Sequence, residues 1–255
     1  IAAIALLAGI FVIIKRRQLQ LESGDTWQGV WSSLVRSGLH RLYRGANQQR
    51  HWRPNILAFT SRREEERAGL VEFGAALVGA GGVLTDFELI DDRKRVAVDE
   101  TESSVGVFHR LTPCEKPFET MEAICRYHGF SGIEPNTVLI PLQKRVGAET
   151  EFDAFLRCAE TSAFNTLMWR SAAEGIAERP EVIDIWWRPE AGRLRFALIL
   201  ARFLQATSVW RDASLRFIIV HRDASRVDGM QKRLSRLMDE QRINAEVKFI
   251  DSELH

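Results

Sequence analysis

Segments of six to eight residues that are rich in apolar side chains recur along most of the chain, and stretches with apolar residues at helical spacing lie between them. Runs of this length, bounded by Gly, Pro, Asn or Asp, are typical of buried strands. The expected strands are residues 55–60, 83–90, 136–141, 182–187, 215–220 and 245–250. The expected helices are residues 64–79, 117–127, 150–170, 193–204 and 227–238. Residues 91–112 are charged and are expected to form a loop. This alternation predicts an α/β fold with mainly parallel sheets flanked by helices.

The pattern restarts in the second half of the chain. The strands beginning at Asn55 and Val182 are 127 residues apart, and the helices that follow them are separated by a similar distance. We therefore expect an internal duplication, with a first α/β half over residues 51–145 and a related second half over residues 146–255.

The chain opens with fourteen residues that carry no charge, followed directly by Lys15, Arg16 and Arg17. A transmembrane helix needs about 20 apolar residues, so residues 1–17 are expected to be the end of a span whose beginning is missing. Basic residues directly after a span mark its cytoplasmic side. A signal peptide would carry its charges before the apolar run, not after it. A fully buried helix of a soluble core is the alternative interpretation.

Residues 18–50 are expected to form a juxtamembrane amphipathic helix and a polar linker. The helix covers residues 26–43, and its apolar stripe includes Trp27 and Trp31. Arg36, Arg41 and Arg44 lie largely off that stripe. Three interpretations remain open: the helix lies in the membrane interface, packs against a membrane body or partner chain, or is an ordinary core helix.

Charge is distributed unevenly although the net charge is only +1. Residues 15–63 contain ten basic and two acidic residues, whereas residues 64–255 contain 25 basic and 32 acidic ones. A basic segment of this kind faces an anionic partner. Because the expected membrane span already accounts for the charges, we expect an anionic lipid surface as the partner and no nucleic acid.

Composition narrows the class of protein further. A chain of 255 residues with 45% hydrophobic and 27% charged residues is neither disordered nor fibrous. Its three cysteines, Cys114, Cys125 and Cys158, form no CxxC motif, which excludes a zinc ribbon and a disulfide-stapled scaffold. The thiols are expected to be free and buried in a reducing compartment.

Candidate chemistry is sparse. Thr60, Ser61 and Arg62 follow the first expected strand and precede a helix, so they are weak candidates for holding a phosphate or nucleotide. The alternative is a helix N-cap with solvated charges. The glycine cluster at residues 79–82 follows a helix, as in helix termination, and lacks the Lys and Ser/Thr of a phosphate loop. The six histidines are scattered and serines lack a GxSxG context, so we expect no catalytic site, no metal and no cofactor.

Three patches of sequence carry a family resemblance. They are Asp25-Thr26-Trp27-Gln28-Gly29, Trp52-Arg53-Pro54-Asn55-Ile56-Leu57, and the pair formed by Ile183-Asp184-Ile185-Trp186-Trp187 and Trp210-Arg211-Asp212-Ala213-Ser214-Leu215-Arg216. Together they resemble the cytoplasmic C-terminal domain of cation–chloride cotransporters, of a short, prokaryote-like kind. The double Trp alone would indicate only a strand packed on both faces, with at least one of Trp186 and Trp187 buried.

The resemblance implies a regulatory, dimerising domain with a fold related to universal stress proteins. It implies a multi-pass membrane protein of the amino acid–polyamine–organocation superfamily that carries out electroneutral symport of chloride with a cation such as potassium. The expected partners are the membrane body of the same transporter and a second copy in a homodimer, and most of this segment would be cytoplasmic. Two alternatives are a nucleotide-binding sensor, which lacks its G-x2-G-x9-G-(S/T) signature here, and a membrane-anchored α/β enzyme.

Overall fold

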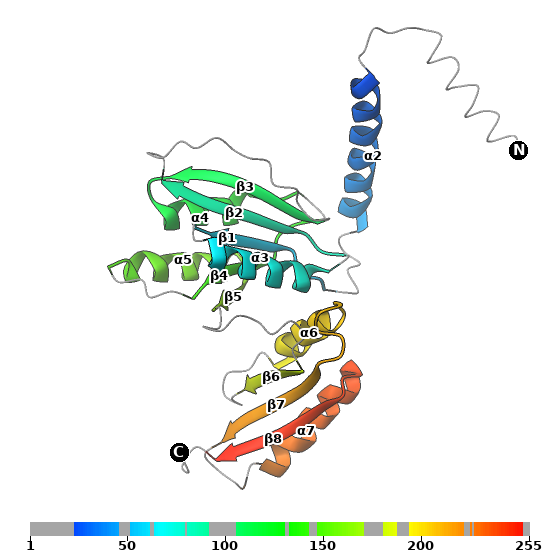
Figure 1. Ribbon diagram of the computed structural model, residues 1–255, viewed down its shortest axis with the longest axis vertical. Helices are drawn as coiled ribbons and strands as arrows, with labels where there is room; N and C mark the ends of the chain where they lie inside the picture. The colour runs from blue at the N-terminus through cyan, green and yellow to red at the C-terminus, as the bar shows by residue number, and fades with distance from the viewer. Residues whose placement is uncertain are drawn as a thin grey trace, which may run out of the picture. The chain divides into compact units, whose positions relative to one another are not determined.

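A computed structural model describes most of the chain (Figure 1). The described residues are 23–45, 52–61, 64–79, 81–91, 106–130, 133–142, 147–170, 181–187, 194–221, 225 and 227–251. The chain divides into two compact units, residues 1–51 with 130–133 and residues 52–129 with 134–255. The first unit contains one described helix, and the second contains all the other described helices and strands.

The helices of the structure are α2 (Ser23–Gly45), α3 (Glu64–Val78), α4 (Pro117–Tyr127), α5 (Glu149–Thr161), α6 (Leu194–Gln205) and α7 (Val227–Gln241). The strands are β1 (Ile56–Thr60), β2 (Leu84–Asp91), β3 (Val107–Cys114), β4 (Thr137–Pro141), β5 (Asn165–Trp169), β6 (Val182–Trp187), β7 (Ser214–His221) and β8 (Ala245–Asp251). Within the described residues no helix is long and apolar enough to cross a membrane. The expected span, with Lys15, Arg16 and Arg17, lies outside the described residues.

The first sheet has five parallel strands in the order β3-β2-β1-β4-β5. The chain moves outward from β1 to β3 and then returns to β4, so its crossover direction reverses between β1 and β4. Because parallel crossovers are right-handed, this reversal places helices on opposite faces of the sheet. Accordingly α3 packs on one face, and α4 and α5 pack on the other.

Side chains alternate between the two faces of the first sheet, so each face has its own hydrophobic core. On β1, Ile56 and Ala58 face α3, whereas Leu57 and Phe59 face α4 and α5. All five β1 residues are buried, as expected for a central parallel strand that is covered on both faces.

The second sheet has three parallel strands in the order β6-β7-β8. Here the chain moves in one direction only, so both crossover helices fall on the same face. Leu198 of α6 and Leu234 of α7 pack against Phe217 and Ile219 of β7 on that face.

The two sheets belong to one unit because α6 contributes to a core that both share. Ala201 and Leu204 at the end of α6 join Leu70 and Leu77 of α3 in one buried cluster. Trp52, just before β1, makes an edge-to-face contact with Phe196 of α6 at a centroid distance of 5.6 Å.

Several expected elements differ from the structure. The expected loop over residues 91–112 contains most of β3, and the helix expected to reach residue 170 ends at Thr161 and is followed by β5. The chain therefore changes sheets between β5 and β6, later than the expected boundary at residue 145, because β5 pairs with β4. The two sheets also have unequal numbers of strands, five and three, and the internal duplication stays a prediction. The likeness to universal stress proteins stays a prediction.

Candidate functional site

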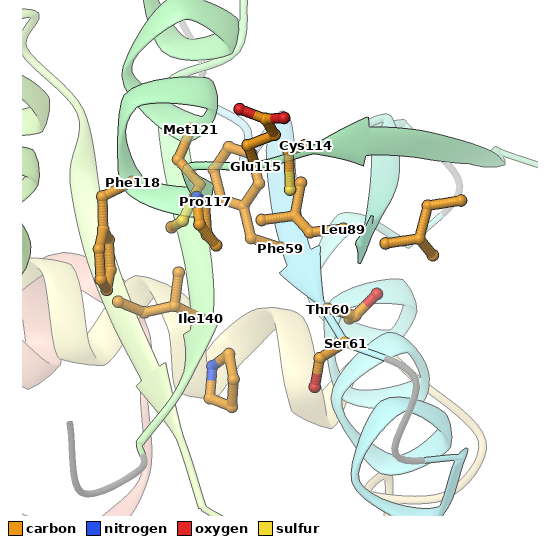
Figure 2. A pocket seen from close by; sticks show the side chains of 12 residues that line it. Phe59, Thr60, Ser61, Leu89, Cys114, Glu115, Pro117, Phe118, Met121 and Ile140 are labelled. Atoms are coloured by element: carbon orange, nitrogen blue, oxygen red, sulfur yellow. The ribbon is translucent and has the colours of Figure 1, made fainter. Parts of the chain in front are cut away.

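A cavity of about 390 Å³ opens at the carboxyl ends of β1, β2 and β4 (Figure 2). This is where the crossover direction of the first sheet reverses, which is the usual ligand position in open α/β sheets. It is lined by Phe59, Thr60, Ser61, Leu89, Ile90, Cys114, Glu115, Pro117, Phe118, Met121, Ile140 and Pro141. Its position therefore makes it the leading candidate for a small-molecule site.

The lining of this cavity is mainly apolar. Figure 2 shows Thr60 and Ser61 at the end of β1 on one side, and Phe118, Met121 and Ile140 on the opposite side. Among the described residues of the lining, Glu115 is the one with a formal charge. The described part of the cavity wall is therefore suited to an apolar group.

The hydroxyl of Thr60 is already engaged in a buried polar cluster. Its Oγ1 donates a hydrogen bond of 2.6 Å to Oδ1 of Asp86. The guanidinium of Arg67 donates to Oδ2 of the same carboxylate from Nε and Nη2, at 3.1 and 3.0 Å. His109 places Nδ1 3.0 Å from Asp86 Oδ2 and Nε2 3.5 Å from Glu88 Oε2. The cluster thus joins β1, β2, β3 and α3.

Sequence analysis did not predict this cluster. Asp86 is 1% exposed, a position that a carboxylate occupies only when it is paired and hydrogen-bonded. The available signal was the alternation of Asp86 and Glu88 in an otherwise apolar strand, which places both carboxylates on one face. Their partner His109 could not be found because it lies in a stretch expected to be a loop.

The phosphate candidates are only partly brought together. Thr60 is buried and bonded to Asp86, Ser61 is exposed at the cavity, and Arg62 lies outside the described residues. Helix α3 begins with three glutamates, residues 64–66. Arg62 and Arg63 directly precede these glutamates in the sequence. That Thr60, Ser61 and Arg62 hold a phosphate or nucleotide stays a prediction.

Helix α2 contains the membrane-facing candidates. Val30, Trp31, Leu34 and Val35 are each half or more exposed and lie on one side of the helix. The further candidates Arg36 and Arg41 are also exposed. Trp27 and Arg44 lie within the helix, but the structure does not describe their side chains. That the helix contacts a membrane stays a prediction.

The Trp-Arg-Pro-Asn patch lies at the amino ends of the first sheet's strands. The side-chain oxygen of Asn55, Oδ1, accepts a hydrogen bond of 3.1 Å from the backbone N–H of Val83. The backbone N–H of Asn55 donates to Oδ1 of Asn136 at 3.2 Å. Asn136 in turn donates from Nδ2 to the carbonyl of Arg53 at 2.7 Å. The two asparagines therefore fix the starts of three neighbouring strands, while Trp52 contacts α6.

The third patch of the resemblance lies on the second sheet. Arg216 of β7 donates from Nε and Nη2 to the two carboxylate oxygens of Asp184 on β6, at 2.7 and 2.8 Å. This two-point hydrogen bond lowers the pKa of Asp184 below its ordinary value. Trp186 is 64% exposed, and Trp187 is half-buried against the α6–α7 core on the opposite face. The prediction of opposite faces is confirmed, but neither indole is fully buried: Trp186 lies on the face that no described helix covers, and Trp187 is only partly covered by the α6–α7 core.

The pKa values of Cys125, in α4, and of His128, directly after α4, are shifted from their ordinary values. Burial between α4 and α5, helped by nearby Cys158, raises the pKa of the Cys125 thiol to about 12. Burial against Phe87, and then the charge of Arg110, lowers the pKa of His128. Among the described residues no three Cys, His, Asp or Glu side chains gather in a metal-ligating group.

Solved structures of similar fold are known. No protein-family model matches the chain. The crystal structure of the cytoplasmic domain of a prokaryotic cation chloride cotransporter is similar to it, with a TM-score of 0.59 and 19% sequence identity. The similarity covers 79% of this chain and 80% of that one. This chain has that domain's fold. At this level of identity the similarity establishes the fold, an α/β fold of mainly parallel sheets flanked by helices, and function remains to be argued from the residues.

Proposed function

We propose that this chain is the cytoplasmic regulatory domain of a membrane transporter that moves a cation together with chloride. In this proposal residues 1–17 complete the last transmembrane helix, α2 links it to the folded domain, and the domain pairs two protomers. The domain itself is not an enzyme and transports nothing, because the ion sites would lie in the membrane body of the same protein.

The observation that carries this proposal is the coincidence of fold and motif. A fold comparison alone supports many functions, since one fold serves unrelated activities. Here, however, the residues that carry the resemblance to cotransporter domains make contacts between helices and strands of the fold. Trp52 contacts α6, Asn55 orders three strands, and Asp184 pairs with Arg216 across β6 and β7. The resemblance rests on sequence motifs and the similarity rests on the fold, so the two lines of support are partly independent.

The most direct test is transport by the full-length protein in reconstituted vesicles. Uptake of Rb⁺ as a tracer cation is measured with chloride inside and outside, and again with chloride replaced by gluconate. The proposal predicts uptake that falls to the level of protein-free vesicles without chloride. Uptake by well-folded protein that is indifferent to chloride would contradict it.

A nucleotide-binding sensor is the second candidate, and the cavity at the switch point of the first sheet is the observation that favours it. Glu115 in the lining argues against a phosphate ligand there, whereas Arg62 and Arg63, which follow Ser61 in the sequence, would favour one. Calorimetric titration of the chain with millimolar MgATP separates the two candidates. The leading proposal predicts no saturable heat, whereas saturable binding that is lost in Ser61→Asp would favour the sensor.

A further inference from the structure

The second sheet has one face that no described helix covers. Side chains alternate along its strands, and those of Ile183, Leu215 and Phe217 face α6 and α7. The intervening side chains form what we call the open face. It consists of Val182, Asp184, Trp186, Ser214, Arg216, Ile218, Val220, Glu246, Lys248 and Ile250.

An open face is unusual for a parallel sheet, because such sheets are normally buried on both sides. In this chain it follows from topology. The strand order β6-β7-β8 places both right-handed crossovers on one side, so α6 and α7 leave the other side uncovered. The first sheet avoids this by reversing its direction between β1 and β4.

The composition of the open face is that of a protein–protein interface. Its centre is Trp186, 64% exposed and aligned in the ladder with the exposed Lys248 and with Ile218, which is itself only 4% exposed. Trp and Arg are among the residue types most enriched at interface positions that dominate the binding energy. The indole of Trp186 is exposed and therefore available to a partner. The neighbouring Arg216 is held in place by its two hydrogen bonds to Asp184.

The charges of the open face identify its partner. Asp184, Arg216 and Glu246 are aligned across the three strands, and Lys248 lies two residues beyond Glu246. Two negative and two positive charges give no net charge, so the face offers no attraction to an anionic lipid surface or to a nucleic acid. A second copy fits it well, because a two-fold axis places this face on itself and each basic group can meet an acidic group of the other copy.

We propose that the open face of β6, β7 and β8 packs against the same face of a second copy of this chain, with Trp186 at the centre of the interface. This inference depends on the pairing role proposed above and assigns it a surface. It does not depend on the identity of the transported ions.

Analytical ultracentrifugation of the chain in a mild non-ionic detergent tests the assignment. Trp186→Asp is expected to weaken the dimer by about thirtyfold or more, the range of a central interface residue. Tyr127→Asp is the matched control, since Tyr127 is an exposed aromatic residue on α4, away from the open face. The control is expected to leave the dissociation constant unchanged. Melting temperatures check that each variant is folded.

A charge exchange keeps the test decisive even if Trp186→Asp does not fold. Glu246→Lys gives the open face a charge of +2 and Lys248→Glu gives it −2, so each variant alone is expected to be monomeric. An equimolar mixture of the two is expected to recover dimers. Dimers of either variant alone, at wild-type strength, would overturn this surface while leaving pairing itself intact. A monomeric wild-type chain would overturn the inference and the pairing role together, and chloride-dependent uptake would still test the transport role separately.

Discussion

At the scale of single residues, the most constrained groups are the buried polar ones. Asp86 is almost completely buried, yet its carboxylate meets the Thr60 hydroxyl, the Arg67 guanidinium and the His109 ring within 3.1 Å. Charge-assisted hydrogen bonds of this kind offset the cost of removing a carboxylate from water. The cluster therefore stabilises the junction of β1, β2 and β3 with α3, and it leaves Thr60 unavailable as a ligand for phosphate.

Cys125 is expected to be chemically inert in the folded protein. Its thiol is buried and its pKa is raised to about 12, so almost none of it is thiolate at pH 8. Treatment with iodoacetamide at pH 8, followed by mass spectrometry, should leave Cys125 unmodified until urea is added. Modification of Cys125 in native protein at the rate of a free thiol would show that the packing of α4 on α5 is different.

His128 is expected to make stability depend on pH. Its pKa in the folded protein is lowered from the ordinary value of 6.5, so the unfolded chain binds the proton more readily. The free energy of unfolding should therefore fall as pH decreases through 6.5 toward the lowered pKa. Urea titrations at pH 7.5 and 5.5 measure this loss, which should be smaller in His128→Gln. An equal loss in the variant would assign the effect to other groups.

At the scale of elements, the two faces of β6 should respond differently to the same substitution. Trp187 packs with the α6–α7 core, so Trp187→Ala should lower the free energy of unfolding by about 2 kcal/mol, less than for a fully buried indole. Trp186→Ala removes an exposed side chain and should cost about 0.5 kcal/mol or less in the monomer. Urea unfolding of both variants measures the difference, and equal losses would contradict the assignment of faces.

Helix α2 is proposed to set the position of the domain beneath the membrane. Each basic residue near an anionic leaflet is worth about 1 kcal/mol, so Arg36, Arg41 and Arg44 together could contribute about 3 kcal/mol and shift a docking equilibrium about a hundredfold. Changing all three to Gln in the full-length transporter should alter Rb⁺ flux but not the melting temperature of the domain. The matched control changes Arg157, Arg202 and Arg233, which are exposed on the folded domain. Unchanged flux at normal expression would exclude the coupling role, and a large fall in melting temperature would identify α2 as a core helix.

The strands with a clear apolar pattern were predicted from the sequence. Two strands without such a pattern were not predicted. Strands β1, β4 and β6 were found within one residue of their observed starts. Strands β3 and β5 were missed, and both lie at the edges of the first sheet. An edge strand pairs on one side only and tolerates polar residues, such as His109 in β3 and Asn165 in β5, which weaken the apolar pattern.

The candidate site was less predictable than the fold. Thr60 and Ser61 were placed correctly at the end of a strand, because that position follows from local sequence. The engagement of Thr60 by Asp86 was not predictable, since it depends on the register of β1 with β2. The open face likewise depends on strand order, a long-range property that no local pattern contains.

At the scale of the whole molecule, the second unit of the chain is built as two sheets that share one core. The end of α6 packs with α3, and Trp52 ties the start of the first sheet to the same helix. Two sheets joined in this way are expected to unfold together.

The proposal that this domain regulates a chloride-coupled cation transporter is tested by Rb⁺ uptake with and without the domain. Initial Rb⁺ uptake is compared between the full-length protein and a form lacking residues 52–251, both reconstituted at equal density, with and without chloride. We expect uptake by both forms of the protein to need chloride. We expect removal of the domain to change the uptake rate several-fold. Equal rates with and without the domain, or uptake that does not need chloride, would contradict it.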